Sequence, residues 1–188
     1  MRSLSDLAAS LPEAAKDIAL NLETLLRSSA LSAAQRWGTA VASAIASRNQ
    51  AFLDAVLASA SREVHPSVID DAEAAAALMA MTNIYYRFRH LIGKPTYSEK
   101  PARLRMNRLA KPATSKTDLE LFCLAVSAIN GCEACLRAHE KAVLEGGLRE
   151  DQIHDAVRIA AVVHAAAVAL EIPDAKSKAG EPVEAVGA

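Results

Sequence analysis

The most informative stretch of the chain is Asn130-Gly131-Cys132-Glu133-Ala134-Cys135-Leu136-Arg137-Ala138-His139-Glu140, which holds two cysteines three positions apart and a histidine four positions after the second. The Asn-Gly pair is a break signal, and the run that follows it predicts a helix. The cysteines therefore lie at a helix start, where exposed N–H groups and the helix dipole favour a thiolate. On that helix Cys135 and His139 share a face. The stretch predicts a redox-active dithiol.

Helical periodicity extends to both sides of the dithiol. Residues 115–129 have helical spacing, Gly146-Gly147 ends the cysteine helix, and a long helix is predicted over 149–170. Further helices are predicted over residues 3–10, 12–27, 33–46 (capped by Ser32), 50–60 and 68–88, with a short one at 103–109. Because no segment alternates convincingly at period two, we predict an all-α fold.

We expect these helices to form one compact domain, residues 1–172, followed by a disordered tail, residues 173–188. A shift of 84 positions aligns Ala42-Ser43-Ala44-Ile45 with Val126-Ser127-Ala128-Ile129, which favours an internal two-fold repeat of residues 32–92 and 116–172. In the first copy, Arg48 and Ala51 occupy the positions of the two cysteines. The second copy alone would then carry the chemistry.

The composition limits the class of protein. A hydrophobic content of 52 %, mostly small side chains, favours close helix packing, and a net charge of −1 from 21 basic and 22 acidic residues does not suggest a nucleic-acid partner. Three cysteines do not make a secreted disulfide framework, and the N-terminus has no signal-peptide pattern. The most apolar run, residues 156–170, is too short to span a bilayer. We expect a soluble cytoplasmic protein without a membrane segment.

The cysteine pair is also compatible with structural roles. The two thiols could be small core side chains. A structural zinc site would need two more ligands, of which His139 could supply one and Cys123, His154 or His164 another. A thioredoxin-like motif would follow a strand, and no strand is predicted. The dithiol is favoured because the break, the helix start and the histidine occur together.

Two further residues are candidates for proton transfer. His139 could take the Cys135 proton or hold a relay water, because an imidazole exchanges protons near neutral pH. Its alternative is a histidine packed against a neighbouring helix. Glu120 lies between apolar residues and would need a partner if it faced inward, but its spacing alone favours a solvated glutamate. Cys123 is typical of a core thiol.

From residue 11 to about residue 170 the sequence resembles the alkyl hydroperoxide reductase D family, within the carboxymuconolactone decarboxylase-like superfamily. The resemblance is carried by Trp37-Gly38-Thr39, Met81-Thr82-Asn83-Ile84-Tyr85-Tyr86-Arg87, Leu104-Arg105-Met106-Asn107 and Ala125-Val126-Ser127-Ala128-Ile129-Asn130-Gly131-Cys132. It implies an all-helical subunit in a homotrimer, with thiol-dependent peroxidase and disulfide reductase activity.

The resemblance also implies partners. Members of the family reduce alkyl hydroperoxides and re-reduce a partner peroxiredoxin, the C component of alkyl hydroperoxide reductase. No cofactor is tightly bound. Electrons come from dihydrolipoamide, the lipoyl group of a lipoylated acyltransferase, which dihydrolipoamide dehydrogenase reduces with NADH.

By the same resemblance, Cys135 attacks peroxide and becomes a sulfenic acid. Cys132, the more exposed cysteine, is the proton donor that closes the Cys132–Cys135 disulfide and exchanges with the peroxiredoxin. Glu120 and His139 form a proton relay. Ala134 stands where the best-described members carry a second histidine, so the relay has one group fewer here.

The sequence leaves two further functions open. A lactone decarboxylase, the other chemistry of the superfamily, would not need the cysteine pair. In a non-enzymatic helical interaction protein the dithiol would be incidental.

Overall fold

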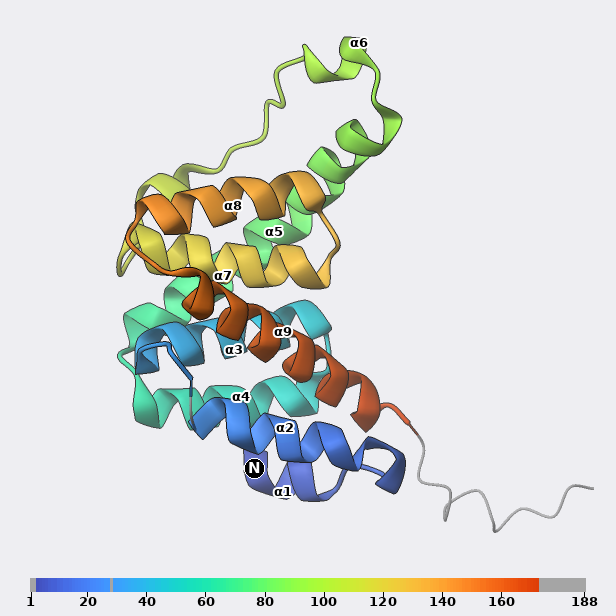
Figure 1. Cartoon of the computed structure of the whole chain (residues 1–188), viewed down its shortest axis with the longest axis vertical. Coiled ribbons are helices and arrows are strands. Elements are labelled where there is room, and N and C mark those ends of the chain that lie inside the picture. Colours follow the sequence, from blue (N-terminus) through green and yellow to red (C-terminus); the bar gives the residue numbers. More distant parts are fainter. Residues whose placement is uncertain (1–2, 28, 173–188) are drawn as a thin grey trace, which may run out of the picture.

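The computed structural model describes residues 3–27 and 29–172, and this part of the chain is helical without a strand (Figure 1). The predicted all-α fold is confirmed; the predicted tail, residues 173–188, lies outside the described residues. The helices are α1 (Leu4–Ala9), α2 (Lys16–Arg27), α3 (Ala33–Ser47), α4 (Gln50–Glu63), α5 (Pro66–Ile92), α6 (Pro95–Ser98), α7 (Lys116–Ile129), α8 (Glu133–Glu145) and α9 (Glu150–Leu170), with short 3₁₀ turns η1 (Glu13–Ala15) and η2 (Asn107–Ala110).

Capping side chains set most helix starts. Ser32 Oγ accepts a hydrogen bond from Gln35 N at 3.2 Å and caps α3, as predicted. The helix predicted to start at residue 68 begins two residues earlier, because His65 caps it and Pro66 is tolerated in a first turn.

The prediction of a short helix over residues 103–109 is wrong. Residues 101–106 have no helical structure, and only η2 follows. Leu104 and Met106 are half-buried while Arg103 and Arg105 are exposed. Packing at period two therefore replaces the helix that the local sequence favoured.

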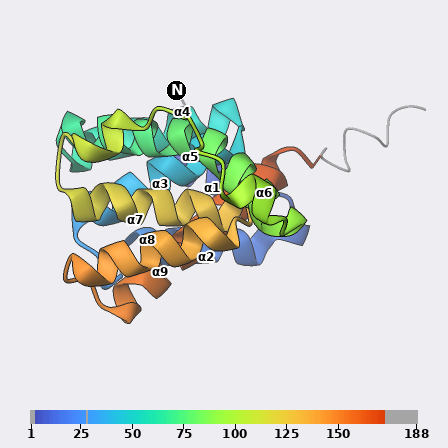
Figure 2. The ribbon, with the colours of Figure 1, turned by 90° about the horizontal axis from the view of Figure 1, so that it is seen from above.

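Helix α3 lies at the centre of the molecule, where it packs against α9, α7 and α5. Its Ala40, Val41, Ala42 and Ala44 are fully buried. Gly38 allows α3 to approach α7 closely, because a Cβ at this position would overlap the ring of Phe122. Helix α7, which carries Glu120, lies between α5 and α8 (Figure 2).

Matching contacts join the two halves of the chain. Helices starting at residues 33, 50 and 66 are followed by helices starting at 116, 133 and 150. Asp71 of α5 accepts from Thr114 N, just before α7, at 2.7 Å. Asp155 of α9 accepts from Ala30 N, just before α3, also at 2.7 Å. Such reciprocal contacts suit two copies related by a two-fold axis; the sequence repeat itself stays a prediction.

The second half of α5 extends beyond the other helices and leads to α6 at the tip (Figure 1). The chain then returns through residues 99–115, which we call the connector. Buried Asp71 fixes the end of the connector, because its carboxylate accepts from Ala113 N and Thr114 N and pairs with Arg108 at 2.7 Å. The connector is thereby held against α5, next to α8.

In the described part of the chain, α9 alone is long and apolar enough to cross a membrane by length and composition. Its Ile159, Val163 and Ala166 are buried, and it packs against α3, α2 and α7. This is the packing of a core helix.

Candidate redox site

A disulfide joins Cys132 and Cys135, whose Cα atoms lie 5.3 Å apart. Cys132 is the N-cap residue of α8, and Cys135 lies in the first turn of that helix. Gly131 adopts a φ of 64°, a left-handed conformation that glycine adopts without strain, and it turns the chain from α7 into α8. The predicted break and the predicted cysteine pair at a helix start are both confirmed.

Buried and half-buried polar side chains hold the turn before α8 in place. Asn130 Nδ2 donates to Asn83 Oδ1 at 2.9 Å, and Asn83 Nδ2 donates to Ser127 Oγ at 3.0 Å. The Arg87 guanidinium donates to the carbonyl oxygen of Asn130. Cys132 N donates to Ser127 O at 3.1 Å. Helices α5 and α7 therefore fix the position of the disulfide jointly.

The prediction that Cys132 is the more exposed cysteine is wrong for this oxidised structure. Cys132 is 0 % exposed, whereas Cys135 is 7 % exposed. The reason is the bond from Cys132 N to Ser127 O, which holds this residue against the last turn of α7. Cys135, one turn further along α8, reaches a cavity instead.

This cavity, the redox cavity, has a volume of about 380 Å³ and lies between α5, the connector and α8. It contains Cys135 and His139 in its wall, together with Ala134, but not Cys132. Most of the other lining is apolar, which suits an alkyl chain better than a charged ligand. The remaining lining residues are Met79, Thr82, Tyr86, Met106, Leu109 and Ala138.

His139 and Glu120 form a close, nearly buried pair. His139 Nδ1 lies 2.6 Å from Glu120 Oε2, and the two side chains are only 11 % and 13 % exposed. The interpretation of Glu120 as a solvated glutamate is therefore wrong, because its inward position is stabilised by an imidazole partner. When Nδ1 carries the proton donated to Glu120, neutral His139 keeps a lone pair on Nε2 for accepting another proton.

Sequence reasoning missed Met79, whose thioether lies beside the imidazole of His139. His139 Nε2 is 3.3 Å from Met79 Sδ, and the hydroxyls of Thr82 and Ser127 each lie 3.5 Å from the same sulfur. A thioether has no proton to donate, so it leaves the lone pair of Nε2 available to a group entering the cavity. The available signal was a pair of polar residues, Thr82 and Asn83, in a long alanine-rich helix.

Cys123 is a free and buried thiol, as predicted. Burial raises its pKa far above the ordinary value, and the charges of Glu120 and Asp71 raise it further. Within residues 3–27 and 29–172, no three His, Cys, Asp or Glu side chains are grouped as metal ligands. His164, a ligand candidate in the zinc alternative, instead lies 3.2 Å from Ser47 Oγ.

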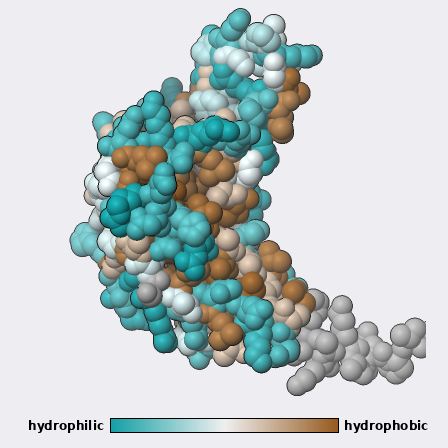
Figure 3. Space-filling view, in the orientation of Figure 1, coloured by the Kyte–Doolittle hydropathy of each residue, from teal (hydrophilic) through white to brown (hydrophobic). Residues whose placement is uncertain are grey.

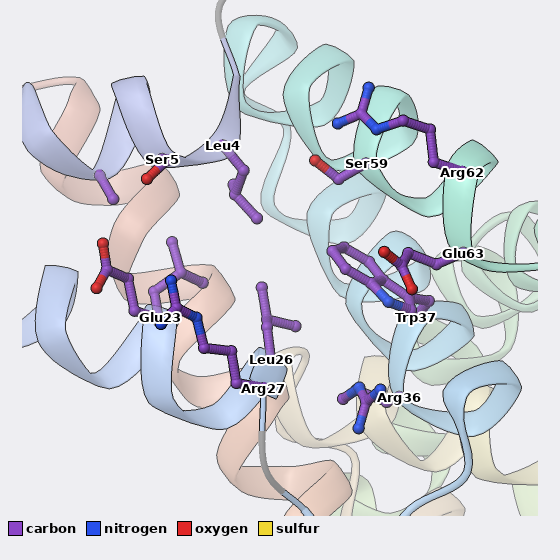
Figure 4. A pocket seen from close by; sticks show the side chains of 12 residues that line it. Leu4, Ser5, Glu23, Leu26, Arg27, Arg36, Trp37, Ser59, Arg62 and Glu63 are labelled. Carbon is purple, nitrogen blue, oxygen red and sulfur yellow. The ribbon is translucent and has the colours of Figure 1, made fainter.

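A second cavity, of about 420 Å³, lies between α1, α2, α3 and α4 (Figure 4). Trp37 and several leucines form its apolar wall, and three arginines and two glutamates lie around it. It contains neither a thiol nor an imidazole, so it cannot carry the chemistry of the dithiol.

Comparisons with known proteins agree with the site. Residues 95–174 match the model of the carboxymuconolactone decarboxylase family. The chain is 62 % identical over 186 residues to the alkyl hydroperoxide reductase AhpD of Anaeromyxobacter dehalogenans strain 2CP-C, and the match covers 96 % of this chain and 100 % of the relative.

Two more distant relatives carry the same name. AhpD of Gluconacetobacter diazotrophicus is 49 % identical over 169 residues, covering 90 % of this chain and 93 % of the relative. AhpD of Rhodospirillum centenum is 45 % identical over 175 residues, covering 93 % and 94 %. With identity of this degree along nearly its whole length, the chain belongs to the AhpD family of the carboxymuconolactone decarboxylase-like superfamily.

Proposed function

We propose that this protein is an antioxidant alkyl hydroperoxide reductase that uses the Cys132–Cys135 pair as its redox centre. The observation that carries the proposal is the position of Cys135 in an apolar cavity, beside His139 and its Glu120 partner. The names of the relatives support the same reaction class.

In the oxidative half-reaction, reduced Cys135 loses its proton to His139 and attacks the terminal peroxide oxygen. The O–O bond breaks, the alkoxide takes a proton and leaves as an alcohol, and Cys135 becomes a sulfenic acid. Cys132 then attacks the Cys135 sulfur, which forms the disulfide and releases water. Glu120 stabilises the imidazolium that forms in the first step.

In the reductive half-reaction, a dithiol enters the redox cavity, and we propose the lipoyl group of a lipoylated acyltransferase. One of its thiolates attacks Cys135 Sγ, and Cys132 leaves as a thiolate. The start of α8 stabilises that charge, because Cys132 is the N-cap residue. The second lipoyl thiol then closes a lipoyl disulfide and releases Cys135, so two electrons and two protons reach the protein. Dihydrolipoamide dehydrogenase and NADH would regenerate the donor.

The second proposed substrate is the disulfide of a partner peroxiredoxin, which Cys132 would attack. Since Cys132 is fully buried in the oxidised structure, this exchange requires the turn at residues 130–132 to open after reduction. Ala134 leaves no second imidazole at the cysteine pair, so His139 and cavity water carry the proton flow.

We also propose that the protein is a cytoplasmic homotrimer. The support for self-association is an apolar surface on the projecting end of α5 (Figure 3), to which α6 adds Tyr97. Its exposed residues are Ile84, Phe88, Leu91, Ile92 and Tyr97. An apolar surface of this kind marks an interaction site rather than a surface that faces water.

A coupled assay tests the proposed function. NADH oxidation is measured with dihydrolipoamide dehydrogenase, a lipoylated acyltransferase domain, cumene hydroperoxide and this protein. We expect turnover that requires both cysteines and is lost in Cys135→Ser. Peroxide reduction that survives Cys135→Ser would contradict the proposal. Decarboxylation of a carboxymuconolactone by a protein lacking both cysteines would support the decarboxylase alternative instead.

A further inference from the structure

The positive charges of this chain are concentrated in one segment. Nine of its 21 lysines and arginines lie between residues 87 and 116, where Glu99 is the only acidic residue. This segment has a net charge of +8, and the rest of the chain has a net charge of −9. The overall value of −1 conceals this separation.

The connector carries these charges at the wall of the redox cavity. Met106 and Leu109 line the cavity together with Cys135. Between residues 102 and 106 the burial alternates: Leu104 and Met106 are half-buried, while Arg103 and Arg105 are exposed. One side of this non-helical stretch therefore faces the protein interior and the other presents guanidinium groups to solvent.

Most of these cations have no partner in the described chain. Arg108 pairs with buried Asp71 and serves to hold the connector. Six others are exposed and form no ion pair with any described residue: Lys94, Lys100, Arg103, Arg105, Lys111 and Lys116. Four of them lie in the connector, Lys116 follows it directly, and Lys94 precedes α6.

The basic side chains of helix α8, on the other side of the cavity, do have acidic partners. Its Glu133 pairs with Arg137, which holds the pKa of that carboxyl below its usual range, and Lys141 pairs with Glu145. Both cations of α8 are therefore paired, and the unpaired positive charge at the cavity lies on the connector rather than on the helix of the dithiol.

We propose that the exposed basic face of the connector is the docking surface for an acidic protein domain that carries the reducing dithiol on a flexible side chain. The inference rests on the proposed function and adds to it the surface that recognises the donor protein. Six exposed cations would attract an acidic domain over the range of the Debye length and raise its rate of association. Its dithiol arm would then enter the neighbouring cavity and meet Cys135.

An acidic protein fits this surface better than a nucleic acid. The surface borders a cavity of about 380 Å³ whose wall contains a redox sulfur, so its partner has to deliver a thiol. A nucleic acid has none. A free small dithiol would need the cavity but not the basic face, and this difference provides the test.

The test compares two reductants on a charge-reversed variant, Arg103→Glu/Arg105→Glu. Stopped-flow rates are measured for reduction of the Cys132–Cys135 disulfide by a lipoylated acyltransferase domain of net negative charge and by free dihydrolipoamide. We expect the second-order rate constant of reduction to fall about tenfold or more for the lipoylated domain and to stay within about twofold for free dihydrolipoamide. Raising the salt concentration should slow reduction by the lipoylated domain much more for the parent protein than for the variant.

The matched control is Lys16→Glu/Arg62→Glu, the same charge change on α2 and α4, at the opposite end of the molecule (Figure 1). It should leave both rates unchanged. An unaltered rate with the lipoylated domain in the connector variant would overturn the proposal, as would an equal loss with both reductants. The proposal would also be overturned if the connector variant had a changed oligomeric state. It would be overturned too if the parent bound duplex DNA in a salt-dependent way while the rate of reduction by the lipoylated domain did not depend on the connector charges. If neither reductant reduces the parent disulfide, the proposed function itself fails.

Discussion

At the level of single residues, the site depends on a short contact between Glu120 and His139. Cys132, Cys135 and His139 could be found from sequence, because their relation is local: one turn and one helix face. The inward position of Glu120 and the contacts of Met79 and Asn83 could not, because they depend on α5, α7 and α8 meeting in space. The family resemblance was the sign for Glu120, and the polar residues inside the long alanine-rich helix were the sign for Met79 and Asn83.

Replacing the carboxylate tests the proton relay. In Glu120→Gln the amide cannot stabilise an imidazolium, so the second-order rate of Cys135 with cumene hydroperoxide should fall roughly 10- to 100-fold. The pH profile of that rate should also change shape, because the group that exchanges the proton has changed. The control is Glu140→Gln, on the exposed face of α8. Rates equal to the parent at every pH would remove Glu120 from the relay.

Cys123 should be inert in the folded protein. Its pKa is raised by burial, so the thiol stays protonated at pH 8, and iodoacetamide should label Cys132 and Cys135 in the reduced protein but Cys123 only in denaturant. The thiol of Cys123 should also make stability depend on pH. An unfolded thiol has a pKa of about 8.5. Below that pH the Cys123 thiol should not affect the free energy of unfolding. Above it the free energy of unfolding should fall, because the thiol ionises in the unfolded state only. Mass spectrometry and urea unfolding of the parent and Cys123→Ala check both statements; rapid native labelling of Cys123 would contradict them.

At the level of elements, the ends of most helices could be predicted from capping residues and glycine breaks. The conformation of the connector could not be predicted in this way. Its largely non-helical conformation depends on Asp71 binding residues 113–114 and on Leu104 and Met106 packing inward, and no local signal reports either contact. The α3–α7 contact is likewise tertiary. There Gln35 Nε2 donates to Asp118 Oδ1 at 2.9 Å, and Gly38 faces Phe122.

Gly38→Ala should destabilise the protein even though alanine is the better helix former by about 1 kcal/mol. The added Cβ overlaps the Phe122 ring, so we expect a net loss of about 1–3 kcal/mol in the free energy of unfolding, measured with urea. In the double variant Gly38→Ala/Phe122→Leu the clash should be relieved, and the two effects should not add. Additive losses, or a stabilised Gly38→Ala protein, would show that this close approach does not limit the packing.

At the level of the whole molecule, the projecting end of α5 exposes several large apolar side chains. Leu91 is 74 % exposed and Ile84 is 64 % exposed. The exposure of these side chains could not be predicted from the periodicity of the sequence, because a core helix and a helix at a subunit contact have the same apolar spacing.

Charge on this surface should prevent assembly. We expect Leu91→Glu to convert a trimer into smaller species in analytical ultracentrifugation, since a carboxylate would be buried without a partner. Leu20→Glu is the control, because Leu20 is also exposed, at 59 %, but lies on α2. A monomeric parent protein, or an unchanged trimer in Leu91→Glu, would contradict the proposed assembly.

The central claim is that the two sulfurs have different roles, with Cys135 reacting in the cavity and Cys132 closing the disulfide. The most direct measurement is trapping of sulfenic acid with dimedone after one equivalent of cumene hydroperoxide, followed by peptide mapping of two single variants. In Cys132→Ser the adduct should form on Cys135, and in Cys135→Ser no adduct should form on Cys132. An adduct on Cys132 in Cys135→Ser, with none on Cys135 in the other variant, would contradict the account.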